Sequence, residues 1–166
     1  MPGYKFGNSE NFSYQVPPGD YRWQVIGVEF GIQRGSGVTN GSDNMDVKLA
    51  FYKDGKKAAQ WTETMIFHDS IFWKIDTFLK SGNYKVGADG RYDPNGRVPK
   101  EGEELNFEAD DIMGLQGWAT VEDNKYKGKD GTERVNSRVA RWLDKEKLPK
   151  AQAEKKVNLP DTGDWV

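Results

Sequence analysis

The chain has no cysteine and a single histidine among its 166 residues. Without thiols it can form neither a disulfide framework nor a thiolate metal site, and nothing requires an oxidising compartment. No apolar run approaches the roughly 20 residues that span a bilayer, and Met1 to Asn11 lacks the apolar core of a secretory signal. We therefore expect neither secretion nor membrane insertion, and a cytoplasmic location.

The usual catalytic constellations are also missing. Ser36 lies in a Gly-Ser-Gly run without the Gly-x-Ser-x-Gly frame of a nucleophile elbow, and Gly128-Lys129 is followed by Asp130, unlike a phosphate loop. The lone His68, just before an expected helix, is more typical of a capping or packing residue than of a catalytic base. We expect a binding protein without cofactor, metal or catalytic residues, and not an enzyme.

One alternative is an enzyme that depends on metal. The segment from Glu101 to Asp111 holds six acidic residues and no basic one: Glu101, Glu103, Glu104, Glu108, Asp110 and Asp111. Such a run can in principle hold magnesium for a nuclease. A solvated acidic loop is the simpler interpretation.

The length suits one domain, since a chain of this size buries roughly 70% of the surface that its unfolded form exposes. Gly19 to Gln33 is predicted to be the first strand. Its apolar residues change phase at Gly27, which indicates a bulge or bend. Gly31 to Asn44 is predicted to be the loop that follows, because glycine, serine and asparagine dominate it.

The second strand has the clearest pattern, because apolar residues alternate from Met45 to Phe51. Asp54-Gly55 is a two-residue hairpin signal, so a third, antiparallel strand is expected from Lys57 to Phe67. A helix should then begin at an Asp69 or Ser70 cap and end at Gly82, since Ile71, Phe72, Ile75, Phe78 and Leu79 recur at helical spacing.

The rest of the chain is less regular. Asn83 to Asp111 is expected to be an inserted excursion with one short strand near Leu105 to Phe107. A fourth strand is expected from Leu115 to Glu122, a polar loop from Asp123 to Thr132, and a fifth strand from Glu133 to Leu143. Lys145 to Lys156 favours a short charged helix, and Val157 to Val166 a tail.

Three antiparallel strands, a helix and a two-stranded hairpin follow one another as in the OB-fold, a five-stranded Greek-key barrel. The expected fold is therefore mainly β: an N-terminal arm (1–15), an OB-type barrel (16–144) with residues 83–111 inserted, and a charged segment with a tail (145–166). Ligands of this fold lie across strands two and three, between the first loop and the last.

The net charge is only −2, so the distribution of charge matters more than its sum. Single-stranded nucleic acid is held by aromatic faces that stack on bases and by cations that follow the phosphates. Both kinds occur at the expected ligand site: Arg34, Lys48, Tyr52, Lys53, Lys56, Lys57, Trp61, Lys125, Tyr126, Lys127, Lys129, Arg134 and Arg138. Tyr52, Trp61 and Tyr126 are the candidate stacking platforms, whereas Trp23, Trp73 and Trp118 are expected in the core.

The last residues form a second candidate site. Asp161, Asp164, Trp165 and Val166 place two acids, an aromatic ring and a carboxylate at the end of the chain. This arrangement is similar in kind to the acidic tails by which bacterial single-strand-binding proteins recruit partners, although Trp-Val stands where that family has Pro-Phe. We expect either docking to a partner or a Trp165 that folds back onto the barrel.

A resemblance to a known family rests on several motifs: Pro17-Pro18-Gly19-Asp20-Tyr21, Met45 to Phe51, Phe72-Trp73-Lys74-Ile75 with Phe78-Leu79, Gly117-Trp118-Ala119, Asn124 to Lys127, and Asn136. Over Val16 to Leu143 the chain resembles small phage proteins encoded beside replication and recombination genes, which are generally taken to be single-strand-binding proteins or close relatives of these. The resemblance implies single-stranded DNA as the ligand, phage or host replication and recombination proteins as partners, and the infected bacterial cytoplasm as location. It implies no catalytic residues.

These observations favour a protein that binds single-stranded DNA without sequence specificity. A second possibility is an accessory or inhibitor module that binds protein on the same fold. The magnesium-dependent nuclease is the third.

Overall fold

The computed structural model describes residues 15–35 and 37–151, and it is mainly β. One five-stranded antiparallel sheet has the order β3-β2-β1-β4-β5, built from β1 (Gly19–Ile32), β2 (Asp43–Lys53), β3 (Lys56–Ile66), β4 (Gln116–Lys127) and β5 (Glu133–Leu143). The sheet is open, with β3 and β5 as its two edges, so the expected closed barrel is not what the structure has. Helix α1 (Phe72–Ser81) packs against both edge strands and against β4. It therefore contacts the two strands that would pair with each other in a closed barrel.

The first three strands follow the sequence pattern closely. The register between β1 and β2 shifts between Val25 and Gly27, which confirms the bulge expected at Gly27. Asp54 and Gly55 form the turn between β2 and β3, both with positive φ (53° and 78°), as a two-residue hairpin requires. Beyond β1, the loop is shorter than expected and comprises residues 33–42.

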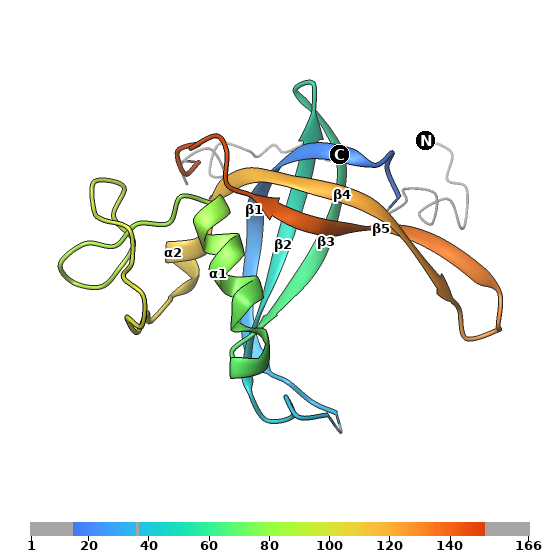
Figure 1. Cartoon of the computed structure of the whole chain (residues 1–166), viewed down its shortest axis with the longest axis horizontal. Coiled ribbons are helices and arrows are strands. Elements are labelled where there is room, and N and C mark those ends of the chain that lie inside the picture. The colour runs from blue at the N-terminus through green and yellow to red at the C-terminus, as the bar shows by residue number, and fades with distance from the viewer. Residues whose placement is uncertain (1–14, 36, 152–166) are drawn as a thin grey trace, which may run out of the picture.

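The core lies on the inner face of the sheet, where alternate residues of the strands are buried. β4 and β5 cross in front of β1–β3, and α1 lies beside them on the same side (Figure 1). The ring of Trp23 stacks on Phe78 of α1 with centroids 5.0 Å apart, and Trp142 of β5 meets both rings edge-on. Large aromatic side chains from β1, α1 and β5 therefore join the two halves of the curled sheet.

The start of the helical segment differs from expectation. A 3-10 turn, η2 (Asp69–Ile71), precedes α1, and its cap is His68 rather than Asp69 or Ser70. His68 Nδ1 accepts a hydrogen bond from the Ser70 amide at 3.1 Å, which confirms the capping role expected of this histidine. Gly82 is the C-cap of α1, as predicted.

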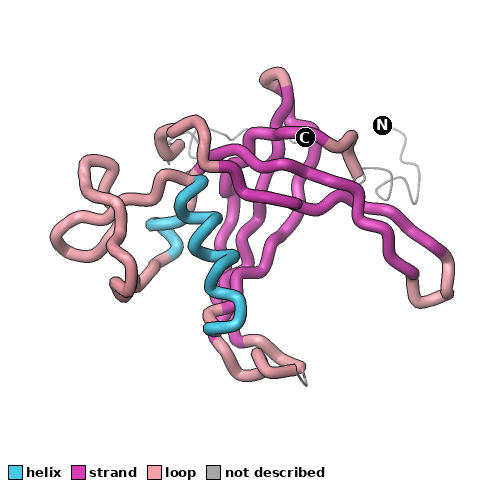
Figure 2. Tube along the Cα trace, in the orientation of Figure 1, coloured by secondary structure: helices cyan, strands magenta, loops and turns pink. Residues whose placement is uncertain are grey.

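The excursion after α1 has little regular structure, and Figure 2 shows it mostly as loop. The strand expected near Leu105 to Phe107 is wrong for the described part of the chain, where these residues pair with no other strand. Two isolated bridges instead join Val86 to Tyr92 and to Arg97, and a short helix, α2 (Ala109–Ile112), leads back to β4.

Two further expectations for the C-terminal half are wrong. β4 continues to Lys127, so most of the polar segment Asp123 to Thr132 is strand and only residues 128–132 form the turn. Cross-strand partners on β5 satisfy the backbone of these polar residues, which local composition alone does not reveal. The predicted bounds of β5 are confirmed.

The charged helix expected at Lys145 to Lys156 is absent as far as the structure describes it. Residues 144–151, which we call the strap, contain no helix. The strap contacts β4 and the residues just before it. Glu146 accepts a hydrogen bond from the Trp118 indole at 2.9 Å, and the Ala151 amide donates to the Gly114 carbonyl at 2.8 Å. These contacts with β4 and Gly114 replace the intrahelical bonds of the expected helix.

Within the described ranges, no helix has the length and apolar character needed to cross a membrane.

Candidate functional site

The face of the sheet opposite the core, here called the outer face, carries one row of side chains across all five strands. Lys57, Tyr52, Arg22, Trp118 and Leu143 are successive cross-strand partners on β3, β2, β1, β4 and β5. We call these five residues the outer row. At its centre, Arg22 alternates with the buried Tyr21 and Trp23, and Trp118 alternates with the buried Gly117 and Ala119.

Each aromatic ring of the outer row has a cation against it. The guanidinium carbon of Arg22 lies 4.6 Å from the centroid of Tyr52, and Lys145 Nζ of the strap lies 4.5 Å from the centroid of Trp118. Arg22 Nη1 also donates to Gln116 Oε1 at 2.5 Å, which orients the guanidinium plane. Both rings are only half-buried, so they offer surface to a ligand from solvent.

Lys48 extends this cationic surface along β2. It is exposed on the outer face, opposite Gly27 of β1 and Thr62 of β3. A Cβ atom at Gly27 would lie 3.3 Å from the Cβ of Lys48, so a side chain there would crowd the lysine. The bulge at Gly27 therefore both bends β1 and leaves room for Lys48.

Asp20 is a second carboxylate near the outer row, besides Glu146 at the Trp118 indole. It accepts a hydrogen bond from the Thr120 hydroxyl at 2.8 Å, and this bond, with the charges of Lys145 and Arg141, lowers the pKa of the Asp20 carboxyl. Lys145 Nζ is 3.6 Å from Asp20, so this lysine lies between a carboxylate and the Trp118 ring.

The β4–β5 hairpin divides its predicted ligand residues between two faces. Tyr126 and Arg134 are partners on the outer face, and Tyr126 is 42% exposed. By alternation Lys125 and Lys127 point to the other side, while Lys129 is exposed in the turn. Arg138 is on the outer face but is held by Glu122 at 2.7 Å and by Asn124 at 3.1 Å.

The remaining predicted residues are spread around the sheet. Arg34 is exposed in the loop after β1, and Lys53 and Lys56 face each other at the opposite end of β2 and β3. Lys53 Nζ lies 4.7 Å from the centroid of the Tyr21 ring.

Trp61 does not join Lys48 and Tyr52 on one face, as the sequence-based set assumed. Its register partner is the buried Leu49, and its ring stacks on Phe51 with centroids 4.0 Å apart. Its indole donates to Glu63 at 2.9 Å. Trp61 therefore packs on the inner face, where its ring extends the core.

Sequence reasoning missed Arg22 and misplaced two tryptophans. Trp118 lies on the outer face, and Trp73 is 62% exposed on α1, although both were expected in the core. Trp23 is fully buried, as expected. The signal for Trp118 was present, because it lies out of phase with Ala119 and Val121 in a strand of period two.

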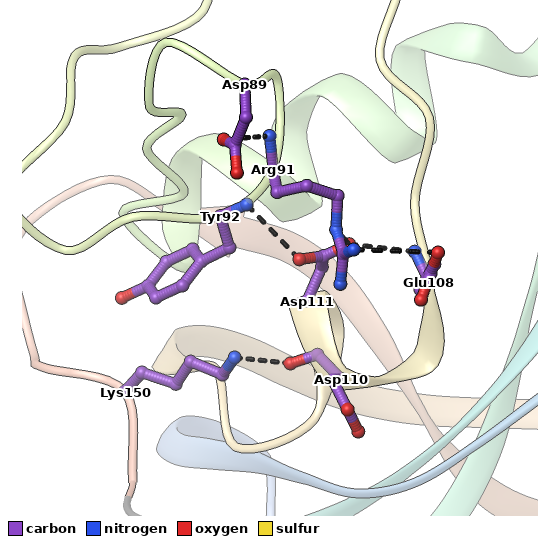
Figure 3. Close-up of polar contacts among 7 residues, drawn as sticks. All are labelled: Asp89, Arg91, Tyr92, Glu108, Asp110, Asp111 and Lys150. Atoms are coloured by element: carbon purple, nitrogen blue, oxygen red, sulfur yellow. Dashed lines mark hydrogen bonds and ion pairs between the residues drawn. The ribbon is translucent and has the colours of Figure 1, made fainter.

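The acidic run is organised by ion pairs. The buried Asp111 accepts from Arg91 Nε at 2.7 Å, from the Glu108 amide at 2.8 Å and from the Tyr92 amide at 3.2 Å (Figure 3). Burial opposes ionisation, but these hydrogen bonds outweigh it and lower the pKa of Asp111. Among the described residues, no three acidic or histidine side chains are grouped so that they would hold a metal ion.

Glu103 has a similar structural role. Both of its carboxylate oxygens bind Arg97 at 2.8 Å, and one also accepts from the Lys100 amide. The hydrogen bonds from Arg97 and then from Lys100 lower the pKa of Glu103 to about 2. In the structure, these two carboxylates therefore hold the excursion in shape.

The predicted tail residues Asp161, Asp164, Trp165 and Val166 lie outside the described residues.

Comparison of the chain with models of protein families, with curated proteins and with solved structures finds no match.

Proposed function

We propose that the outer face binds single-stranded DNA without sequence specificity. Tyr52 and Trp118 would stack on bases, and Arg22, Lys48 and Lys57 would contact the phosphates. The outer row is the observation that carries this proposal, because it sets aromatic rings and cations alternately across the sheet. Base stacking contributes about 1–3 kcal/mol for each base and accepts any of them, since every base has a π-face.

The strand order supports an OB-type fold as part of the same proposal. β1 pairs with both β2 and β4, and α1 lies between β3 and β4 along the chain. An OB barrel that lacks the pairing between β3 and β5 has the same strand order, β3-β2-β1-β4-β5. Proteins of that fold bind oligonucleotides on the face of strands two and three, where Lys48, Tyr52 and Lys57 lie.

The β4–β5 hairpin would lengthen the binding surface. Its turn extends away from the rest of the sheet (Figure 1). Tyr126 and Arg134 there continue the outer face, and Lys129 adds a cation at the tip. Arg138 contributes less, because its charge is already paired with Glu122.

The resemblance to phage single-strand-binding proteins gives the proposal its setting. The chain would coat or protect single-stranded DNA during phage replication or recombination in the bacterial cytoplasm. No catalytic step is part of this role.

Titration of fluorescently labelled oligo-dT, followed by anisotropy, tests the proposal. The wild-type chain should bind, and its affinity should fall steeply between about 50 mM and about 200 mM salt because phosphate contacts release counterions. The double variant Tyr52→Ala, Trp118→Ala should bind at least about 10-fold more weakly, since two stacking contacts are lost. Trp73→Ala removes an exposed tryptophan from α1 and is the matched control, with affinity unchanged.

Four outcomes contradict the proposal. Absence of binding at low salt, or affinity that does not grow with oligonucleotide length, leaves a protein-binding module as the better hypothesis. Degradation of the oligonucleotide on addition of magnesium indicates a nuclease. Equal losses for Trp73→Ala and for the outer-row variant would place the site elsewhere.

A further inference from the structure

A groove of about 410 Å³ lies at the other end of the sheet, away from the outer row. Three phenylalanines line it: Phe30 at the end of β1, Phe67 just after β3, and Phe107 in the excursion. Phe30 is 45% exposed, and the rings of Phe67 and Phe107 are 6.2 Å apart. Phe30 is the register partner of the buried Met45, so the groove opens on the inner face.

One wall of the groove has an unpaired backbone. Residues 104–107 are outside any helix or strand, and Leu105 and Phe107 are half-buried while Glu104 and Asn106 are exposed. Within the described part of the chain, no hydrogen bond reaches the amide or carbonyl groups of these four residues. Such a segment is a template for one more strand, since an added peptide pairs with its backbone and places alternate side chains in the groove.

The surroundings of the groove are acidic. Asp43 lines it, Glu104 is exposed on the unpaired segment, and Asp69 is exposed two residues beyond Phe67. None of these three makes an ion pair with another described residue. An occupant with apolar residues at alternate positions and positive charge beside them fits this wall, whereas the phosphates of DNA would be repelled.

The last described residues contact the segment that follows this wall of the groove. The last described residue, Ala151, donates its amide to Gly114, and Lys150 Nζ donates to the carbonyl of Asp110. Asp110 lies in α2 and Gly114 lies two residues beyond it, while Phe107 precedes α2 by only two residues. From Ala151, an extended chain reaches about 13 Å by residue 155.

Residues 155–159 have the required composition. They are Lys155, Lys156, Val157, Asn158 and Leu159, followed by Pro160. In an extended segment Val157 and Leu159 lie on one side, the two lysines supply charge opposite to that of the rim, and the proline has no amide to continue a ladder.

We propose that residues 155–159 dock in this groove as an added strand along residues 104–107, with Val157 and Leu159 against the three phenylalanine rings. The docking would cover the three phenylalanine rings within one molecule. It is independent of DNA binding, because the groove and the outer row lie on opposite faces.

Amide hydrogen exchange, read by NMR on the full chain, tests the docking. The described contacts leave all four amides of residues 104–107 without partners, whereas an added strand bonds alternate residues and protects two of them. We expect these two to exchange at least about 10-fold more slowly in the wild-type chain than in Val157→Asp, Leu159→Asp. Thr162→Asp, Gly163→Asp adds the same charge beyond the segment and should leave the protection intact.

The absence of cysteine permits a second measurement. Asn106→Cys with Asn158→Cys should form a disulfide within one chain under mild oxidation, because the proposed docking would bring these two positions onto the same side of neighbouring strands. Asn95→Cys with Asn158→Cys is the control and should stay reduced, since Asn95 is exposed in a turn of the excursion. Fast exchange of all four amides in the wild-type chain, or a disulfide that forms only between two chains, overturns the proposal.

Discussion

Lys145 lies over the ring of Trp118, with its Nζ 4.5 Å from the ring centroid, while the Trp118 indole donates to the adjacent Glu146. The strap therefore holds Trp118 by two consecutive residues, one on the π-face and one at the ring edge. A base that stacks on Trp118 must share or displace the position of Lys145. This relationship makes Trp118 a reporter of both the strap and the proposed ligand.

The indole N–H resonance of Trp118 should respond both to changes in the strap and to the addition of oligo-dT. Glu146→Ala removes the acceptor at 2.9 Å, so we expect one indole N–H signal to shift upfield in an NMR spectrum. It should be the signal that is lost in Trp118→Phe. Addition of oligo-dT should shift the same signal and leave that of Trp73 in place; a shift confined to Trp73 would contradict the proposed interface.

Arg22 should contribute one phosphate contact and part of the stacking surface. Arg22→Ala should weaken oligo-dT binding and reduce the slope of log K against log[salt] by about 0.7, the value for one contact to a single strand. Arg22→Lys should keep the slope but recover only part of the affinity, since lysine lacks the planar guanidinium that lies on Tyr52. Arg97→Ala is the control, because Arg97 pairs with Glu103 in the excursion.

Trp61 should be needed for stability and not for binding. Its ring stacks on Phe51, so Trp61→Ala should lower the free energy of unfolding by about 3 kcal/mol in a urea titration. Oligo-dT affinity, corrected for the fraction of folded protein, should stay within about twofold of wild type. This change is smaller than the loss of one stacking contact would cause. Weaker binding of oligo-dT with unchanged stability would instead indicate that Trp61 is part of the DNA interface.

Asp111 should stabilise the fold in a pH-dependent way. Its pKa is lowered in the folded state, so its contribution is present above the unfolded value of 3.8 and is lost as the pH falls through the lower folded value. Asp111→Asn should reduce the free energy of unfolding by about 1–3 kcal/mol at neutral pH, because Arg91 and two backbone amides lose a charged acceptor.

The difference between Asp111→Asn and wild type should therefore shrink on acidification. Denaturant titrations of both proteins, at neutral pH and at a pH below the lowered pKa of Asp111, measure this difference. Asp110→Asn, at the exposed neighbouring position, should change stability by less than about 0.5 kcal/mol. A constant difference across this range would show that the charge of Asp111 is not what stabilises the excursion.

Gly117 should tolerate no side chain. A Cβ atom there would lie 2.5 Å from the Ser81 carbonyl oxygen and 2.9 Å from the Trp23 ring, so α1 would have to move away from β4. Gly117→Ala should lower the free energy of unfolding by about 1–3 kcal/mol. Gly37→Ala, where nothing lies within 4 Å of the added atom, should be neutral in the same thermal or urea titration.

The elements themselves were largely predictable because their signals are local. The period of two in β2, the Asp54-Gly55 turn, the bulge at Gly27 and the bounds of β5 depend on neighbouring residues, and the structure has each of them. The expected strand at Leu105 to Phe107 has the same local alternation but no partner among the described residues. A strand requires hydrogen bonds from another segment, which its own residues do not encode.

The candidate site depended on tertiary structure. Sequence alternation alone placed Lys48 and Tyr52 on an outward face, and the pairing of five strands then aligned Tyr52 with Arg22 and Trp118 in one row. The same pairing placed Trp61 against Phe51 on the inner face. Period and composition therefore determined which strands this chain forms, whereas cross-strand register and the contacts of α1 and the strap decided which side chains share a surface, because those contacts join residues far apart in the chain.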